Sequence, residues 1–208
     1  MSERFNTEVL IVGTGISGLL AAIKLSERYS ITILSKSSLS DCSTAWAQGG
    51  IAAVIDNEDN INNHIKDTIN NGHEICNAKS VQQIIKQGRD SIELLLNYGV
   101  NFNKKGKELD QTLEGGHSHR RIVYHNDNTG EEVHSSLLIE ARKKKNIIIK
   151  ENIMVIDMIG KKENYCEGVY AYDKRNNNVV SIKANIIILA TGGASKIYQY
   201  TTNPNTST

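Results

Sequence analysis

This sequence has few cysteines, almost no excess of either charge and no long apolar runs. The three cysteines, Cys42, Cys76 and Cys166, are far apart and odd in number, which argues against a disulfide framework and against the CxxC spacing of many metal sites. The 24 basic and 23 acidic residues leave a net charge of +1, so no overall field favours nucleic acid or a membrane surface. No apolar run is long enough to span a bilayer. We therefore expect no bound metal, no nucleic-acid partner and no membrane partner.

The sequence also lacks a charged-then-apolar export signal at its N-terminus. Together with the few, unpaired cysteines, this absence favours a soluble protein in the reducing cytoplasm. The 208 residues, 39% of them apolar, are enough for one large domain, or for a domain and part of another.

The opening of the sequence has the pattern of a βαβ unit. Residues 9–12 form a short apolar run ended by glycine, as in a strand that is buried on both faces. Residues 16–28 carry leucine and isoleucine at helical spacing, and residues 31–34 are a second apolar run. Parallel strands need such a crossover helix between them, so we expect a Rossmann-like α/β fold with a central parallel sheet.

The rest of the sequence alternates between helical and strand patterns. Residues 78–97 predict one long amphipathic helix that stops at Gly99, and residues 101–121 predict a polar surface loop or hairpin. Further expected elements are a helix over 130–145, strands over 147–149 and 153–159, a hairpin over 169–172 and 179–182, and a buried strand over 186–189. The hairpin would add a β-meander to the parallel sheet.

Gly13, Gly15 and Gly18 form a GxGxxG motif between the first predicted strand and helix. In a dinucleotide-binding turn the first glycine permits the tight turn, the second lets the backbone approach a pyrophosphate, and the third lets the helix pack on the strand. The helix N-terminus adds amide donors and a positive dipole end. The alternative, a tight turn that binds nothing, is the weaker interpretation in a βαβ unit.

The second predicted strand ends in Leu34, Ser35 and Lys36, where an NAD-binding domain has an acidic residue for the ribose hydroxyls. This departure argues against an ordinary NAD-binding domain. In one interpretation Lys36 lies near a nucleotide, and in the other it is a solvated lysine.

Two further segments are rich in glycine. Residues 43–51 contain too much glycine and too little charge for an ordinary helix, and residues 190–193 follow a buried strand pattern. Hydroxyls and bare backbone amides suit the lining of a cofactor, whereas a simple turn and a sharp bend are the alternatives.

Residues 114–121, with the sequence EGGHSHRR, place one acid, two histidines and two arginines in a flexible loop. Such a cluster suits a substrate that carries carboxylate or amine groups, and an ordinary surface loop is the alternative. An HxH pair without further ligands is a poor metal site.

In their order along the chain, the segments GTGISG, STAWAQGGIAAV, EGGHSHRR and LATGGASKIYQYTTNP closely resemble the L-aspartate oxidases. These flavoenzymes open bacterial NAD biosynthesis and are relatives of the flavoprotein subunits of succinate dehydrogenase and fumarate reductase. The resemblance spans essentially the whole chain. It implies FAD-dependent oxidation of L-aspartate to iminoaspartate, with oxygen or fumarate as electron acceptor and quinolinate synthase as the consumer of the imine.

The resemblance also implies which residues serve the site. Ser43 stands where the respiratory relatives usually carry a histidine that is bonded to FAD, so FAD would be held non-covalently. Glu114, where those relatives usually have glutamine, would orient the ammonium group of the substrate. The cofactor-binding residues implied by the motifs are Gly13, Thr14, Gly15, Ile16, Ser17, Gly18, Lys36, Ser43, Thr44, Ala45, Trp46, Ala47, Gln48, Gly49, Gly50, Thr191 and Gly192.

By the same resemblance, residues 1–208 are the N-terminal portion of a FAD-binding domain, without the family's capping and C-terminal helical domains. The arginine acid–base and the carboxylate-binding residues of the family are expected outside this sequence. No residue is therefore named as catalytic, and we expect the chain alone to be inactive. Two alternatives remain: a fragment of a fumarate reductase-like or succinate dehydrogenase-like flavoprotein, and a FAD-binding module without catalysis.

Overall fold

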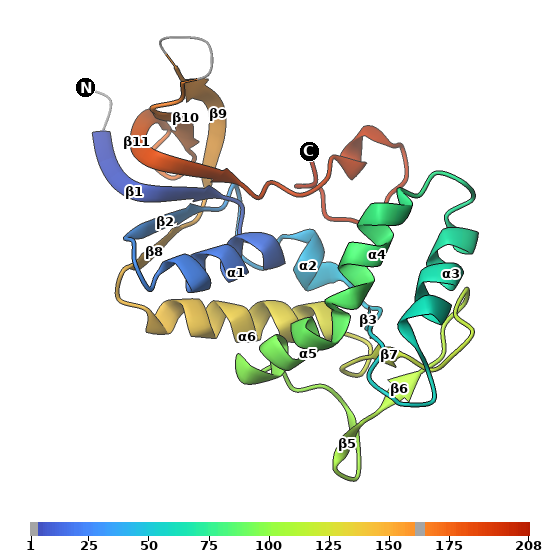
Figure 1. Cartoon of the computed structure of the whole chain (residues 1–208). Coiled ribbons are helices and arrows are strands. Elements are labelled where there is room, and N and C mark those ends of the chain that lie inside the picture. The colour runs from blue at the N-terminus through green and yellow to red at the C-terminus, as the bar shows by residue number, and fades with distance from the viewer. Residues whose placement is uncertain (1–3, 161–164) are drawn as a thin grey trace. The chain divides into compact units, whose positions relative to one another are not determined.

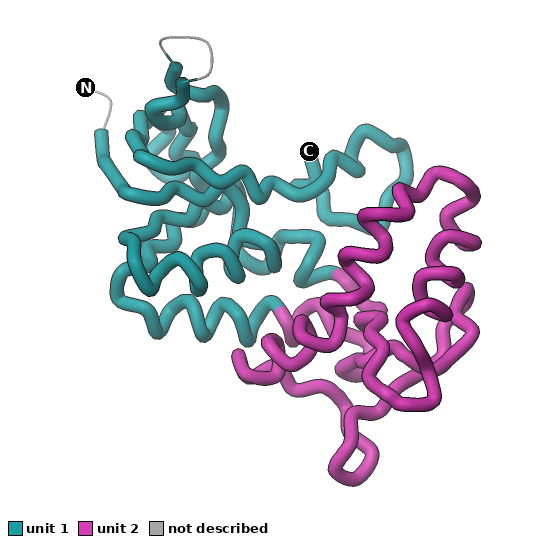
Figure 2. Tube along the Cα trace, in the orientation of Figure 1, with its two compact units in different colours: residues 1–46, 134–208 teal, residues 47–133 magenta. Residues whose placement is uncertain are grey.

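The computed structural model describes residues 4–160 and 165–208. The chain divides into two compact units, coloured teal and magenta in Figure 2. The first unit comprises residues 1–46 and 134–208, and the second comprises residues 47–133. The first contains the predicted βαβ unit, and the second contains the segment predicted as a long helix.

The first unit is built on a six-stranded sheet in which four neighbouring strands are parallel (Figure 1). From one edge to the other the strands are β8 (Ile147–Lys150), β2 (Ile31–Leu34), β1 (Arg4–Val12), β11 (Asn178–Leu189), β10 (Gly168–Asp173) and β9 (Ile153–Ile159). β10 and β9 continue the sheet with antiparallel pairing. The expected α/β class with a central parallel sheet is confirmed.

Strand β1 forms the buried centre of this sheet because its final residues are apolar on both faces. Val9, Leu10 and Ile11 are completely buried, and β1 pairs with β2 on one side and with β11 on the other. Helix α1 (Ile16–Leu25) connects β1 to β2, so the βαβ unit is confirmed, with a helix that ends at Leu25 rather than at residue 28. Helix α6 (Thr129–Lys143), from residue 134 onward, runs along the same face of the sheet (Figure 1).

Strands β10 and β11 form the expected hairpin, and β9 pairs with the outer side of β10. Val169 and Ile182, paired across the hairpin, are completely buried in one cluster with Leu10 and Leu34 of the parallel strands. The hairpin therefore shares its core with the parallel sheet. Because β11 is 12 residues long, the hairpin strand and the strand expected over 186–189 are one continuous strand.

The expectation that residues 186–189 are buried is wrong for this structure. Ile186 is 45% exposed and Leu189 is 62% exposed. β10 pairs with β11 only as far as Lys183, whereas β1 pairs with it up to Leu189. The last part of β11 is therefore covered by a neighbouring strand on one side only.

The second unit consists of three helices and short strands. The helices are α3 (Ile61–Asn71), α4 (Ala78–Lys86) and α5 (Gly88–Asn97); β3 (Ile51–Ala52), β7 (Ile122–Val123) and β6 (Gln111–Thr112) form one small sheet, and β4 (Lys104–Lys105) and β5 (Glu108–Leu109) form a hairpin. The hairpin turns at Gly106, whose φ is +69°. This agrees with the expected surface hairpin, although the expected segment ends at a buried arginine.

The single helix expected over 78–97 is two helices separated at Gln87. Gln87 has φ −93° and ψ 1°, which is outside the helical region. The next residue is glycine, the poorest helix former after proline, and a Cβ at Gly88 would be 3.4 Å from the Cβ of Ala53. The apolar periodicity continues through the break, so the pattern alone could not reveal it. The expected stop at Gly99 is confirmed by its φ of +87°.

Two single turns of helix complete the first unit, α2 (Ser43–Trp46) and the 3-10 turn η1 (Ser195–Ile197). The sequence predicted no ordinary helix over 43–51. The structure corrects this for the first four residues, which contain no glycine and form one turn before the chain reaches Gly49 and Gly50.

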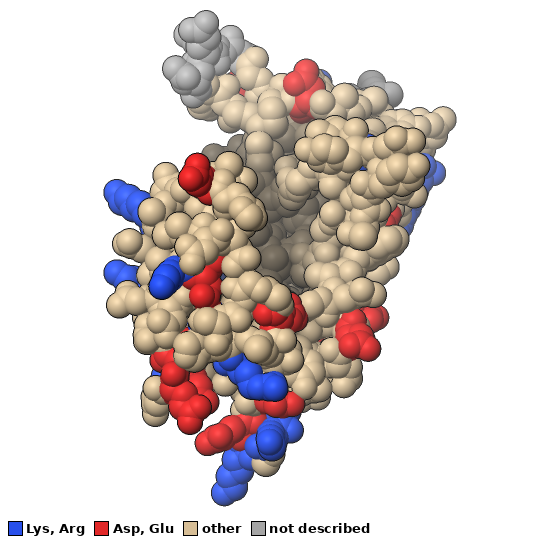
Figure 3. Space-filling model, turned by 90° about the vertical axis from the view of Figure 1, so that its right-hand side faces the viewer, with Lys and Arg blue, Asp and Glu red and all other residues tan. Residues whose placement is uncertain are grey.

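Acidic and basic side chains are interspersed over the face of the molecule that Figure 3 presents. Within residues 4–160 and 165–208, the helices are all too short or too polar to cross a membrane.

Candidate cofactor site and substrate loop

The turn between β1 and α1 is held by close backbone packing that only glycine permits. Gly13 has φ +116°, and its amide donates to the carbonyl oxygen of Leu34 at 2.9 Å. A Cβ at Gly13 would lie 2.2 Å from the carbonyl oxygen of Ala190, and a Cβ at Gly18 would lie 2.0 Å from that of Gly13. The roles predicted for the first and third glycines, the tight turn and the close packing of helix and strand, are both observed.

The N-terminus of α1 retains its capacity to bind an anion. Its N-cap residue, Gly15, makes no side-chain capping bond, and the first turn contains no acidic residue. The Thr44 hydroxyl accepts the Ile16 amide at 3.1 Å, which joins the beginning of the second glycine-rich segment to this turn. The amides of a helix N-terminus and the positive end of the helix dipole form an anion site. Their arrangement fits a pyrophosphate-bearing cofactor.

The third glycine-rich segment begins beside the first. The Ala190 amide donates to the Val12 carbonyl oxygen at 2.9 Å, where β1 and β11 both end. Thr191 and Gly192 are exposed, and Gly192 has φ +74° with open space around its Cα. The predicted sharp bend is therefore present, and its exposed backbone lies next to the Gly13 turn.

Lys36 and Ser43 meet a segment that the sequence analysis did not assign to the site. Lys36 Nζ donates to the backbone oxygen and to the hydroxyl of Thr208, at 3.1 and 2.8 Å, and the hydroxyls of Ser43 and Ser207 are 3.0 Å apart. The pKa of Lys36 is lowered, first by burial and then by the nearby charge of Lys174. Separations of more than 160 residues left no local signal for these contacts.

His134 is a second residue that sequence reasoning missed. Its side chain is buried on α6, and its Nε2 donates to the carbonyl oxygen of Thr14 at 3.0 Å. Burial lowers the pKa of this imidazole. A neutral ring thus holds the GxGxxG turn from outside the motif, and a lone histidine in a helical pattern gave no hint of this role.

Ala47, Gln48, Gly49 and Gly50 belong to the second unit. The Ala47 carbonyl accepts the Gly130 amide at 2.9 Å. A Cβ at Gly50 would lie 2.4 Å from the Val123 carbonyl oxygen, so this glycine permits the close approach of β3 and β7, whereas Gly49 faces open space. The interpretation of this segment as a simple turn therefore accounts for Gly50. It does not account for residues 47–49, which are exposed.

Glu114 begins a tight turn in the second unit. The His117 amide donates to the Glu114 carbonyl oxygen at 3.2 Å, and Gly116 has φ +84°. The Asn71 amide donates to the Gly116 carbonyl at 2.8 Å, and a Cβ at Gly116 would lie 2.7 Å from that side chain. Glu114 itself is exposed. The loop that was expected to be flexible is thus tied to α3.

Arg121 is completely buried below this turn, although it was expected in a surface loop. Its guanidinium donates to both oxygens of Asp59, at 2.7 and 3.0 Å, and to Asp67 at 2.6 Å. Asp67 Oδ2 also accepts the amide and the hydroxyl of Ser118, at 2.8 and 2.7 Å. The buried charge is therefore paired and hydrogen-bonded, as burial of a charge requires.

The charges of this network favour the ionised carboxylates. Burial raises the pKa of Asp59, but hydrogen bonds from Arg121 and the Asn60 amide outweigh it, and the net pKa lies below the ordinary value. For Asp67, burial is likewise outweighed by Ser118 and Arg121, and the pKa is strongly lowered. The two carboxylates in turn raise the pKa of Arg121 against the effect of its burial.

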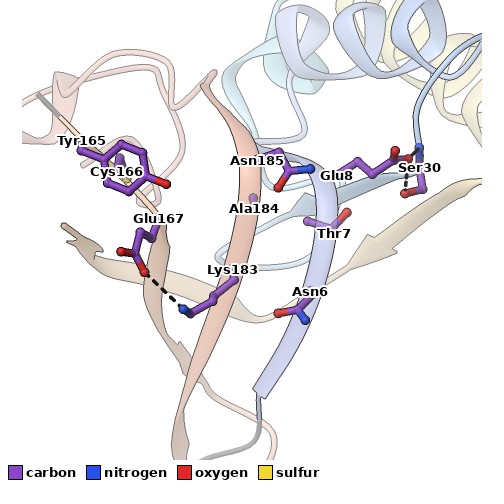
Figure 4. Close-up of a pocket in the computed structure, with 10 residues that line it drawn as sticks. All are labelled: Asn6, Thr7, Glu8, Ser30, Tyr165, Cys166, Glu167, Lys183, Ala184 and Asn185. Carbon is purple, nitrogen blue, oxygen red and sulfur yellow. Dashed lines mark hydrogen bonds and ion pairs between the residues drawn. The ribbon is translucent and has the colours of Figure 1, made fainter. Parts of the chain in front are cut away.

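The first unit also contains a hollow of about 880 Å³, and Figure 4 draws the side chains that line it. Its charged groups are already paired: Lys183 lies 3.2 Å from Glu167, and Glu8 accepts both the amide and the hydroxyl of Ser30 at 2.7 Å. The β1 residues that line it precede residues 9–12, whereas the glycine-rich turn follows them. We assign it no part in the candidate site.

Comparison with known proteins gives close relatives. The L-aspartate oxidase of Acinetobacter baylyi is 42% identical, over 97% of this chain and 38% of the relative. That of Pseudomonas aeruginosa is 37% identical, over 99% of this chain and 40% of the relative. The chain thus spans about two-fifths of the length of these curated relatives.

Solved structures share the fold. A variant of the FrdA chain of Escherichia coli quinol fumarate reductase matches 99% of this chain and 36% of its own length, with a TM-score of 0.91 and 25% identity. Mycobacterium smegmatis Sdh1, solved in complex with UQ1, matches with a TM-score of 0.88 at 24% identity and covers 99% of this chain and 37% of its own. A family model described as a FAD binding domain matches residues 8–208, and the chain accordingly belongs to the FAD binding domain family.

Proposed function

We propose that this chain binds FAD non-covalently and forms part of an enzyme that oxidises L-aspartate to iminoaspartate. The observation that carries the proposal is the N-terminus of α1 at the Gly13 turn, where Gly15 makes no side-chain capping bond, beside the exposed bend at Gly192. Helix amides and bare glycine backbone suit a pyrophosphate. The exposed residue Ser43 has no side-chain nitrogen that could bond to a flavin, which supports non-covalent binding.

Residues of both units are proposed to serve the cofactor and the substrate. In the first unit, the cofactor residues are Gly13 to Gly18, Lys36, Ser43 to Trp46, Thr191 and Gly192. In the second unit, the cofactor residues are Ala47 to Gly50. Glu114 accepts a hydrogen bond from the ammonium group of L-aspartate. A carboxylate that faces an ammonium group selects an amino dicarboxylate over succinate, because succinate would leave the carboxylate unpaired.

When it is bound, FAD supplies a two-electron acceptor for the oxidation. We propose oxygen or fumarate as the final acceptor, quinolinate synthase as the consumer of the imine, and the cytoplasm as the location. We propose no acid–base residue: Arg121 is buried in an ion-pair network, His117 is hydrogen-bonded to Arg121, and His119 is hydrogen-bonded to Ser118.

Residues 1–208 are proposed to correspond to the N-terminal portion of a FAD-binding domain. The curated relatives are about two and a half times as long as the part that matches. The activity proposed here is that of the whole enzyme, to which this chain contributes the cofactor turn and the substrate loop.

Fumarate reduction is the second candidate function, favoured by the structural likeness to a fumarate reductase chain with a TM-score of 0.91. Glu114 distinguishes the two candidates, because an unpaired carboxylate beside a dicarboxylate substrate is unfavourable. We therefore prefer the amino dicarboxylate.

The test is a titration of the FAD-loaded chain with L-aspartate and with succinate, followed by flavin absorbance or calorimetry. Wild-type protein is expected to bind L-aspartate more tightly than succinate. Glu114→Gln should lose that preference by about tenfold or more, because a hydrogen bond to a charged group contributes about 1.5–3 kcal/mol. Glu108→Gln, a change at an exposed glutamate of β5, is the matched control. An unchanged preference in Glu114→Gln would reject the role of Glu114, and a preference of the wild type for succinate would favour the second candidate.

A further inference from the structure

The hydrogen bonds of His117 determine which of its ring nitrogens carries a proton when the ring is neutral. His117 Nδ1 lies 3.1 Å from Arg121 Nη1. A guanidinium has five donors and no acceptor, so the imidazole nitrogen that faces it must be the acceptor. In the neutral ring, Nδ1 is therefore bare, and Nε2 carries the hydrogen.

The neighbouring histidine is fixed in the opposite tautomer. The Ser118 hydroxyl lies 2.7 Å from Asp67 Oδ2 and 2.9 Å from His119 Nδ1. An ionised carboxylate has no hydrogen to give, so the hydroxyl donates to Asp67 and accepts from His119. His119 Nδ1 therefore carries the hydrogen, in agreement with its distance of 3.5 Å from Asp59 Oδ1.

The two rings consequently present different groups at their free nitrogens. Among the described residues, neither Nε2 atom has a hydrogen-bond partner, and both side chains are half-buried. His117 offers an N–H donor, and His119 offers a bare acceptor. Glu114 and His117 begin and end one tight turn, so their Cα atoms lie within about 7 Å.

From these contacts we propose that His117 is a substrate-binding residue whose Nε2–H donates to a carboxylate oxygen of the amino dicarboxylate. Arg121 is the positioning residue that fixes its tautomer. The inference rests on the proposed function, since it names the group that would accompany Glu114 in holding the same substrate. A donor and a carboxylate in one turn complement the carboxylate and the ammonium group of an α-amino acid. Asp59 and Asp67 act one step further away, because they hold Arg121 in place.

The tautomers can be measured directly, without cofactor or substrate. Long-range ¹H–¹⁵N NMR spectra of the ¹⁵N-histidine-labelled chain at pH 8.5 distinguish the two neutral forms. The proposal expects His117 as the Nε2–H form and His119 as the Nδ1–H form. Ser118→Ala, which leaves Arg121 untouched, should change the signals of His119 while those of His117 keep the Nε2–H pattern. An Nδ1–H pattern for His117 in the wild type would overturn the proposal.

The contact with substrate is tested by binding to the FAD-loaded chain. His117→Gln keeps an N–H donor near the position of Nε2, whereas His117→Leu has none. L-Aspartate affinity should fall about tenfold or more in His117→Leu and be largely restored in His117→Gln. If wild type and His117→Leu bind L-aspartate equally, the contact is refuted while the proposed function stands. A chain that binds FAD but no dicarboxylate would refute the contact, while the substrate assignment, which belongs to the whole enzyme, would stand. Absence of FAD binding would refute the proposed function itself, and the NMR result would still decide the tautomers.

Discussion

The glycine-rich turn of the first unit and the EGGH turn of the second, residues 114–117, are fixed in different ways. At Gly13 and Gly18 the backbone is held by close approach to other backbone atoms. The EGGH turn lies on a buried guanidinium whose two carboxylate partners come from the segment 59–67. The first turn depends on shape and on the absence of side chains, and the second on paired charges. Each should therefore be broken by a different kind of substitution.

Removal of the buried charge should have the largest effect. Arg121→Met would leave Asp59 and Asp67 without their common partner in a buried site. We expect a loss of about 3–5 kcal/mol in the free energy of unfolding, the usual cost of breaking a buried ion pair by removal of one partner. Chemical denaturation followed by circular dichroism measures it.

The adjacent arginine provides the matched control. Arg120 is exposed, so Arg120→Met should change the free energy of unfolding by no more than about 0.5 kcal/mol. Equal losses in the two variants would show that the network is not what holds the turn.

Addition of one methyl group to the other turn should have the next largest effect. Gly13→Ala would place a Cβ 2.2 Å from a backbone oxygen at φ +116°, and neither the clash nor the strain can be relieved by a side-chain movement. We expect a loss of about 2–4 kcal/mol together with loss of FAD binding. Gly193→Ala, at an exposed glycine with open space around it, should change stability by less than about 0.5 kcal/mol. A stable Gly13→Ala variant would contradict the account of this turn.

The contact between His134 and Thr14 should have a smaller effect. His134→Leu would leave the buried Thr14 carbonyl without a donor, and the expected loss is about 1–3 kcal/mol. His134→Gln, which retains an N–H donor near the position of Nε2, is expected to recover most of it. A weaker affinity for FAD in the leucine variant alone would show that this contact orders the cofactor turn, whereas equal affinities in both variants would limit His134 to a structural role.

The smallest expected effect is a modest pH dependence of the free energy of unfolding, to which both units contribute. His134 in the first unit and His64 in the second both have a lowered pKa, chiefly because of burial. As the pH falls below about 6.5, the unfolded chain therefore takes up protons before the folded chain does, so stability is complete above this pH and declines below it. Denaturation midpoints between pH 8 and pH 5 measure the decline.

Substitution separates the two contributions to this pH dependence. His134→Gln should remove part of the decline and leave the part that belongs to His64. The exposed His73→Asn serves as the control and should leave the profile unchanged. A profile for His134→Gln identical to that of the wild type would contradict the assignment.

The sequence was most informative where neighbouring residues determine the structure. The βαβ unit, the meander and the glycine-rich turn depend on local apolar runs and on glycines with positive φ, and these patterns are visible within about 30 residues. The break at Gln87 was invisible because apolar periodicity continues through it. Exposure of Ile186 and Leu189 could not be foreseen, because it depends on where β10 stops pairing with β11.

The candidate site was only partly predictable from the sequence, because several of its contacts join residues that are far apart along the chain. EGGHSHRR gave the composition of the substrate loop but not the fact that one of its arginines is buried and the other exposed. Asp59 and Asp67 lie 62 and 54 residues from Arg121, and no pattern in the sequence joins them. His134 lies 120 residues from Thr14. Contacts across such distances are decided by packing and were therefore found only in the structure.

An FAD titration of the purified, folded chain, read by flavin fluorescence and visible absorbance, shows directly whether this chain holds a non-covalent FAD site. We predict saturable binding, release of intact FAD on acid precipitation, and loss of binding in Gly13→Ala but not in Arg120→Met. A folded wild-type chain that fails to bind FAD, or flavin that stays with the acid-precipitated protein, would contradict a non-covalent FAD site in this chain.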